Sequence, residues 1–94
     1  MMEVGVLQFT LRLRGCRSLK QKRQVVRSIK ERLKARYNVA VAEIDDLDVW
    51  QTGILGLTTC GNDSKRILTI LQKIVDQLAA HPEAELLDHQ IDLL

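Results

Sequence analysis

The spacing between apolar residues switches along the chain between two and three-to-four, and the order of these switches limits the possible folds. Residues 2–14 alternate strictly. One face of this segment carries Gly5, Leu7, Phe9, Leu11 and Leu13. A period of two over this length predicts a strand with one buried face. Residues 38–45, 50–60 and 84–94 are further short segments rich in apolar and β-branched residues, and we predict a strand in each.

Two other segments have helical spacing. Ser18 is a suitable N-cap, and no Gly or Pro follows it until well beyond residue 37. One stripe of the predicted helix holds Leu19, Val26, Ile29, Leu33 and Tyr37. Asn38 then follows as a predicted left-handed C-cap. The second helix has an apolar face formed by Ile67, Leu71, Ile74 and Leu78. Pro82 ends it.

The predicted order is therefore β-α-β-β-α-β in a chain of 94 residues, a length that favours a single domain over residues 1–94. The connection between residues 45 and 50 is short, which predicts a hairpin. Right-handed crossovers place both helices on the same side of one sheet. We therefore expect an α+β ferredoxin-like sandwich, with two helices on one face of a four-stranded antiparallel sheet.

Positive charge is concentrated in one quarter of the chain. Residues 12–36 contain eleven Arg or Lys and only one acid, Glu31, for a net charge of +10. The rest of the chain carries −8, so the overall +2 hides a strongly dipolar sequence. On a helical wheel five basic residues form one ridge beside the apolar stripe. They are spaced 3, 4, 3 and 4 apart: Lys20, Arg23, Arg27, Lys30 and Lys34.

Such a ridge is unfavourable for the helix alone, because like charges at i,i+4 repel and cations at a helix N-terminus oppose the dipole. Neighbouring positions about 5–6 Å apart suit a row of phosphates. Three interpretations stay open: a phosphate-bearing partner, pairing with acids of the same chain or a second copy, and a solvated surface. Lys22 falls within the apolar stripe, in the first turn, where a Lys side chain can reach past the core edge.

Arg12 and Arg14 extend the positive zone onto the face of the first strand that points away from the predicted core. RNA-recognition motifs bind RNA on this face by stacking bases on aromatic residues. The chain has three aromatic residues, of which Phe9 and Tyr37 are assigned to the core. Trp50 is expected to cover the edge of the core, with a partner-contact anchor as the alternative. Any RNA would therefore be read through its phosphates and shape.

No set of residues predicts catalysis. Glu43, Asp45, Asp46 and Asp48 lie in one acidic turn, whose spacing is equally that of a solvated loop. No phosphate-binding glycine motif and no metal-ligand spacing of Cys or His is present. We expect neither a cofactor nor a metal, and no small-molecule substrate. No apolar run approaches the length of a membrane span, and the N-terminus lacks a positive region before its apolar part, so a cytoplasmic protein with two reduced thiols is expected.

The whole sequence resembles the YlxP-like family of small bacterial proteins, a domain of unknown function. The segments that carry the resemblance are VGVL at 4–7, RSLKQKR at 17–23, NVAVAE at 38–43, DVWQ at 48–51 and EAELLD at 83–88. Family members often have Pro-Gly-Ala where this chain has Arg14-Gly15-Cys16. The resemblance implies a ferredoxin-like fold without an established activity. Genes of this family often neighbour those for translation-initiation and ribosome-binding factors, so the resemblance implies a role near RNA or ribosome assembly.

The leading hypothesis is binding of RNA or the ribosome, without catalysis. The predicted nucleic-acid-binding residues are Arg12, Arg14, Arg17, Lys20, Lys22, Arg23, Arg27, Lys30 and Lys34. Backbone N–H groups of residues 14–18 and of the helix start would add phosphate contacts. The alternative is a protein-interaction or homodimerisation module whose basic helix docks on an acidic surface, such as the last strand or the acidic turn of a second copy.

Overall fold

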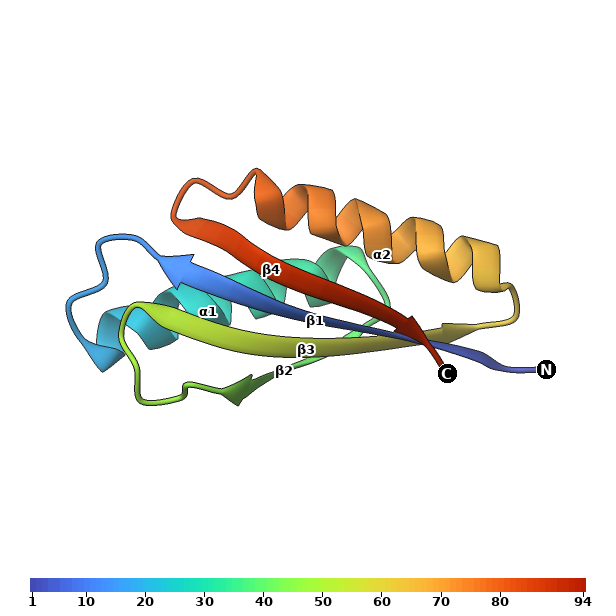
Figure 1. Cartoon of the computed structure of the whole chain (residues 1–94), viewed down its shortest axis with the longest axis horizontal. Coiled ribbons are helices and arrows are strands. Elements are labelled where there is room, and N and C mark those ends of the chain that lie inside the picture. Colours follow the sequence, from blue (N-terminus) through green and yellow to red (C-terminus); the bar gives the residue numbers. More distant parts are fainter.

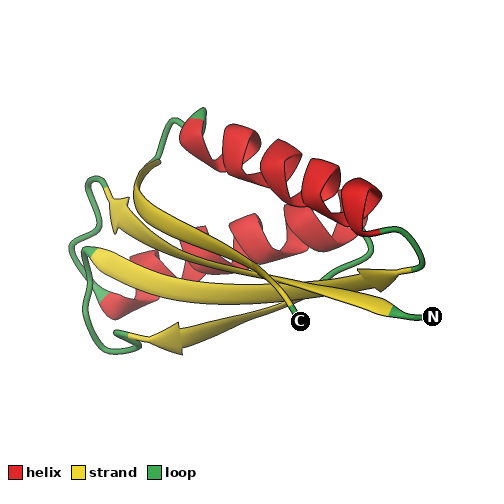
Figure 2. Cartoon of the chain, turned by 45° about the vertical axis from the view of Figure 1, so that its right-hand side comes forward, coloured by secondary structure: helices red, strands yellow, loops and turns green.

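The computed structural model describes all 94 residues and has the predicted β-α-β-β-α-β order. Strands β1 (Glu3–Leu13), β2 (Ala40–Asp45), β3 (Thr52–Gly61) and β4 (Ala84–Leu93) form one antiparallel sheet in the order β2-β3-β1-β4. Helices α1 (Leu19–Arg36) and α2 (Ser64–Ala79) lie together on one face of this sheet (Figures 1 and 2). The predicted ferredoxin-like fold is confirmed.

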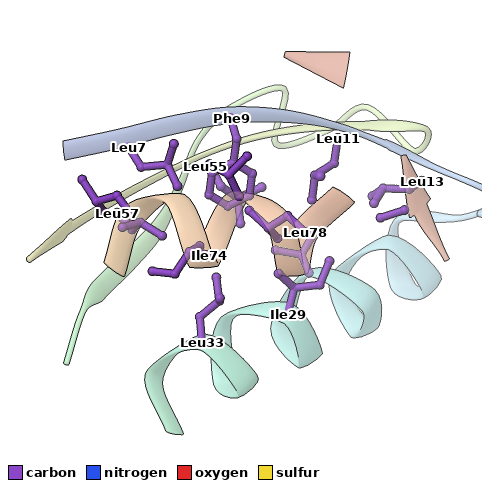
Figure 3. Packing of buried hydrophobic residues seen from close by; sticks show 14 of the residues in the cluster. Leu7, Phe9, Leu11, Leu13, Ile29, Leu33, Leu55, Leu57, Ile74 and Leu78 are labelled. Carbon is purple, nitrogen blue, oxygen red and sulfur yellow. The ribbon is translucent and has the colours of Figure 1, made fainter. Parts of the chain in front are cut away.

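The core lies between the sheet and the two helices. The alternating residues of β1 point into it, and four of them are almost completely buried: Leu7, Phe9, Leu11 and Leu13. They meet Ile29 and Leu33 of α1 and Ile74 and Leu78 of α2 (Figure 3). Because β1 is a central strand, the period of two in its sequence fixes which face of the whole sheet is covered.

A close approach of α2 to the sheet depends on Gly5. A Cβ atom at this position would clash with Cγ2 of Ile67 and lie 3.0 Å from Cδ1 of Leu71. Both neighbours are buried, so they have little room to move. The glycine within the alternating pattern of β1 therefore marks the place where the helix packs directly on the backbone.

The end of α1 differs from the sequence prediction. Asn38 is not a left-handed cap, because the only non-glycine residue with positive φ is Asp46. The helix ends at Arg36, and Tyr37 is extended, with φ −129° and ψ 151°. The Tyr37 N–H still donates to the Leu33 carbonyl at 2.8 Å. The chain can therefore enter β2 directly, and no left-handed residue is needed.

Strand β4 does not alternate strictly, although strict alternation of Leu87, His89, Ile91 and Leu93 against Leu86, Asp88, Gln90 and Asp92 is what its sequence predicts. Leu86 pairs with Leu11, and the register then shifts so that Asp88 pairs with Thr10 and His89 with Phe9. This bulge leaves Leu87 as the additional residue. Because directly paired residues share a face, Leu86 and Ile91 both point toward the helices, although a strict alternation separates them.

Three loops gather at one end of the sheet, which we call the loop end: residues 14–18, 46–51 and 80–83. The Leu13 N–H donates to the Gln51 carbonyl at 2.7 Å, and the Arg14 N–H donates to the Glu83 carbonyl at 3.1 Å. Figure 1 shows the start of α1 at this same end, and both chain termini at the other. The structure contains no helix that is long and apolar enough to cross a membrane.

Candidate nucleic-acid interface

The five residues predicted as one ridge do lie on the outer side of α1, and we call them the basic ridge: Lys20, Arg23, Arg27, Lys30 and Lys34. Four are exposed and Lys30 is half-buried. Arg32 and Arg36, on the other flank of α1, line a hollow with Ala80 and Pro82 after α2. The helical spacing therefore directs the basic ridge away from α2, toward the β2 side of the molecule.

The ion pairs of the chain leave the basic ridge free. The structure contains three pairs within 4.0 Å, which involve Arg12, Arg14 and Lys22. No carboxylate reaches any residue of the basic ridge, and none reaches Arg17. Of the nine residues predicted to bind nucleic acid, six thus have unneutralised side chains, although the rest of the sequence carries a net charge of −8.

Lys22 does not belong to the interface. Its side chain is completely buried, and Nζ lies 2.8 Å from Oε2 of Glu43. Nζ also donates a hydrogen bond to the main-chain carbonyl of Asp46. The sequence-based prediction that this side chain reaches past the core edge is wrong, since it is held below the loop end and cannot meet a phosphate.

Glu43 is the buried counterpart of Lys22. It lies on the helix-facing side of β2, opposite Leu55, and its side chain is 14% exposed. No donor other than the ammonium group of Lys22 reaches Oε2, so this group alone offsets its charge. Both residues occupy positions that the apolar periodicity of their elements assigns to the core. A charged residue of each sign at a core-facing position is the sequence signal that could have identified this buried ion pair.

The same lysine organises the β2–β3 loop. The carbonyl of Asp46 accepts from Lys22 and from the Val49 N–H at 3.1 Å, while its carboxylate accepts from the Thr52 hydroxyl at 3.1 Å. Asp46 has a φ of 57°, a left-handed conformation that short polar residues tolerate best. The acidic turn therefore contributes internal hydrogen bonds, through which α1 fixes the loop.

Arg12 and Arg14 lie beside each other at the loop end and share one partner. Their guanidinium groups are 3.7 and 3.5 Å from Oε1 of Glu85 on β4. The arginine side chains are 58% and 63% exposed, so water screens both contacts. Surface pairs of this kind contribute about 0–1 kcal/mol, which leaves both arginines available to a stronger anion.

The N-terminal cap of α1 uses some of the amides proposed for phosphate binding. The Ser18 hydroxyl accepts from the Gln21 N–H at 3.1 Å, and the Gln21 side chain accepts from the Arg17 N–H at 2.7 Å. This is a reciprocal arrangement like a capping box. The Arg17 side chain remains free, but its backbone N–H already has a partner.

The open face of the sheet has no aromatic residue. Phe9 is buried on the helix side, and Tyr37 is half-buried with its hydroxyl 3.3 Å from the Gln77 side chain. A shallow depression of about 360 Å³ on the open face is lined mainly by small and aliphatic side chains, including Val6, Ala42 and Ile44. Stacking of bases across this face, as in RNA-recognition motifs, has no support from these residues.

Trp50 is exposed at the loop end. Its relative exposure is 47%, and it is not among the residues that pack against the core. The expectation that it covers the core edge is therefore wrong. Leu47 and Val49 of the same loop are also exposed, at 55% and 42%. Trp50 is thus the most exposed of the three aromatic side chains.

The other groups with possible reactivity are the two thiols and the His81 ring. Cys16 and Cys60 are free thiols, and burial is the main cause that raises the pKa of Cys16, followed by the nearby Glu83 carboxylate. The His81 ring accepts a hydrogen bond from the Glu83 N–H at 3.1 Å. No group of three or more His, Cys, Asp or Glu side chains is placed to hold a metal ion.

A family described as "Protein of unknown function (DUF503)" matches residues 4–91. The chain belongs to this family. A relative in Bacillus subtilis (strain 168), described as uncharacterized protein YlxP, is 31% identical over 68 residues, which are 72% of this chain and 74% of the relative. The resemblance stated from the sequence is confirmed.

Among solved structures, the chain is similar to the C-terminal domain of LarC, described as a cyclometallase involved in the synthesis of the NPN cofactor of lactate racemase, in its apo form. The two are 15% identical, with a TM-score of 0.47. The likeness covers all of this chain and 56% of the other, so the chain spans little more than half of that domain.

Proposed function

We propose that this protein binds RNA, free or within the ribosome, through the basic ridge together with Arg12, Arg14 and Arg17, and that it catalyses no reaction. The observation that supports this most directly is the absence of any carboxylate within 4.0 Å of the basic ridge and Arg17. A fold with twelve acidic residues leaves these cations without partners. The two reduced thiols suit a cytoplasmic location.

The energetics favour an anionic partner over an idle surface. Arg23 and Arg27, and likewise Lys30 and Lys34, are like charges at i,i+4, and each such pair costs about 0.2–0.5 kcal/mol in an isolated helix. Phosphates placed along the basic ridge would remove this repulsion. Binding would also release counterions condensed on the RNA, which is the main source of affinity for a phosphate-binding surface.

The proposed mode of binding is recognition of backbone and shape. The basic ridge spans about four turns of α1, so it offers a row of charges about 20 Å long. Because the open sheet face carries no aromatic platform, base edges are not read there. Structured RNA, whose phosphates are held in a fixed geometry, is the partner class that this surface fits best.

The proposal is tested by measuring the affinity for a structured RNA between 50 and 300 mM salt. We expect the logarithm of the association constant to fall linearly with log salt, with a slope of several units, because each neutralised phosphate contributes about 0.7–0.9. A double substitution of Arg23 and Arg27 by Ala should reduce the slope by one to two units. No binding, or a flat salt response, contradicts the proposal.

A matched control is available on the same helix. Arg32 and Arg36 are also exposed and have no carboxylate partner, but they lie on the other flank of α1, beside the chain that follows α2. Substituting both by Ala lowers the net charge by as much as substituting Arg23 and Arg27. If this control weakens binding as much as the Arg23 and Arg27 substitutions, binding follows net charge and the basic ridge is not the interface.

The alternative is an interaction between protein chains. The outer strands β2 and β4 each have one unpaired edge, and β4 carries Asp88 and Asp92 on the open face. A basic ridge docked on this acidic strand of a second copy would give a dimer that dissociates at high salt. Light scattering of the nucleic-acid-free protein at 50 and 500 mM salt distinguishes the two: a salt-sensitive dimer favours the alternative.

A further inference from the structure

Trp50 is exposed on a loop that the rest of the molecule holds in place. The β2–β3 loop is fixed by the Lys22 and Val49 hydrogen bonds to the Asp46 carbonyl, and by the Thr52 hydroxyl on the Asp46 carboxylate. The Leu13 N–H holds the next residue, Gln51, by its carbonyl. A large apolar ring is thus presented to solvent from a preorganised backbone, which reduces the entropy lost when it binds a partner.

Two groups of cations flank this loop. On one side the buried Lys22 joins the loop to the first turns of α1, and these turns also carry Lys20 and Arg23 at the start of the basic ridge. Figure 1 shows the β2–β3 loop beside the start of α1. On the other side, Arg12 of β1 lies opposite Thr52 of β3 in the sheet. The hydrogen bond from the Leu13 N–H to Gln51 extends this pairing by one position, and Arg14 and Trp50 are the next residues along the two segments.

The loop and the residue before it carry three carboxylates, Asp45, Asp46 and Asp48, of which the first two accept hydrogen bonds from neighbouring groups. Asp45 accepts from the Asp46 N–H at 2.8 Å, and Asp46 accepts from Thr52. An exposed indole between two sets of cations matches the chemistry of a nucleotide, which has an aromatic face and a phosphate on each side. An acidic peptide shares the charge of a nucleotide but covers the indole only where it carries an aromatic side chain between its carboxylates.

We propose that Trp50 is a stacking site for an unpaired base, with the adjoining phosphates held by Arg12 and Arg14 on one side and Lys20 and Arg23 on the other. This inference rests on the proposed RNA binding and specifies the ligand: a structured RNA that carries a single-stranded segment next to the part held by the basic ridge. Stacking on an aromatic residue tolerates any base, so no sequence preference is expected from Trp50 itself.

The chain contains a single Trp, so its fluorescence reports this contact directly. The protein is titrated with a labelled single-stranded RNA of about eight nucleotides and, separately, with a blunt RNA duplex, at 50 mM salt. RNA anisotropy gives the affinity and Trp50 emission reports stacking. We expect strong quenching with the single strand, and little with the duplex, which has no unpaired base to offer.

Substitutions separate stacking from simple apolar contact. Trp50→Ala and Trp50→Leu should each weaken single-strand binding roughly tenfold, whereas Trp50→Phe should retain most of the affinity. Leu47→Ala, in the same loop and equally exposed, should have little effect. Because these side chains are exposed, the thermal unfolding of all four variants should match that of the parent protein.

The outcomes of the two proposals are distinct. Binding of RNA that leaves Trp50 emission unchanged and is insensitive to Trp50→Ala overturns the stacking site and leaves the basic ridge intact. Full affinity in Trp50→Leu shows an apolar contact without stacking, as for a protein partner, and also overturns it. Absence of binding to either RNA overturns both proposals.

Discussion

At the scale of single residues, Lys22 shows how the surroundings of a charge decide its role. It is one of eleven basic residues between positions 12 and 36, and its side chain is the only one of them that is fully buried. The nearby Arg23 is exposed and has no ionic partner. One position along a helix turns a side chain by about 100°, which separates a buried structural ammonium group from a free surface charge.

Substituting Lys22 should therefore affect stability and leave RNA binding unchanged. Lys22→Met leaves the Glu43 carboxylate buried without a counter-ion, and we expect the free energy of unfolding to fall by about 3 kcal/mol in urea denaturation. The double variant Lys22→Met with Glu43→Met removes both charges. It should recover most of the loss, except about 1 kcal/mol for the Asp46 carbonyl that loses its donor.

The folded double variant also checks the boundary of the interface. Its affinity for structured RNA should equal that of the parent protein, whereas Arg23→Ala should weaken binding. A double variant that folds normally and loses RNA affinity would place Lys22, or the loop that it holds, within the binding surface.

At the scale of elements, α1 combines two faces with different requirements. Its inner face packs Val26, Ile29 and Leu33 into the core, and this packing supplies the stability of the helix. The outer face carries the basic ridge, whose repulsion the packing has to offset. A helix that keeps such an arrangement gives up local stability at its surface, which is typical of residues retained for binding.

Charge reversal at Arg23 should have opposite effects on stability and on RNA binding. In Arg23→Glu, the new carboxylate lies near the helix N-terminus, one turn before Arg27 and one turn after Lys20. We expect the protein to gain about 0.3–1 kcal/mol in stability, measured by thermal or urea unfolding. RNA affinity should fall by roughly tenfold or more at low salt.

Arg32→Glu is the control for this experiment, since it makes the same charge change on the opposite flank of α1. It should leave RNA affinity much less affected. A variant Arg23→Glu that keeps its affinity for RNA would contradict the assignment of the basic ridge as the interface.

At the scale of the whole molecule, the position of charge matters more than its sum. The net charge is only +2, and the sequence outside residues 12–36 carries −8, yet only three ion pairs join acids to bases. Glu85 is the acid that forms ion pairs with residues of the proposed interface, Arg12 and Arg14. Asp92 lies on the same strand toward the opposite end of the sheet.

Two isosteric variants compare these acids. Glu85→Gln and Asp92→Asn raise the net charge equally, but only the first frees two arginines at the loop end. We expect Glu85→Gln to increase RNA affinity by roughly two- to fivefold and to change stability by less than about 1 kcal/mol. Asp92→Asn should change affinity less, and equal effects in filter binding or anisotropy would show that net charge alone decides binding.

Much of the architecture could be read from the sequence, because it depends on the periodicity of apolar residues. The alternation in β1 and the three-to-four spacing in both helices are local patterns, and the direction of each follows from the geometry of its own element. The basic ridge has the same origin, since its five side chains share a face through helical spacing alone. Their order along one helix determined that they would form a row.

The tertiary structure decided which of those charges are free. Burial of Lys22 depends on Glu43 and Asp46, which are 21 and 24 positions away in sequence and meet it only when β2 packs beneath α1. The bulge at Leu87 likewise depends on the pairing of β4 with β1. The exposure of Trp50 depends on the backbone hydrogen bonds that hold the β2–β3 loop in place. Periodicity assigns a side chain to a face of its own element, but contacts between distant segments determine what that face meets.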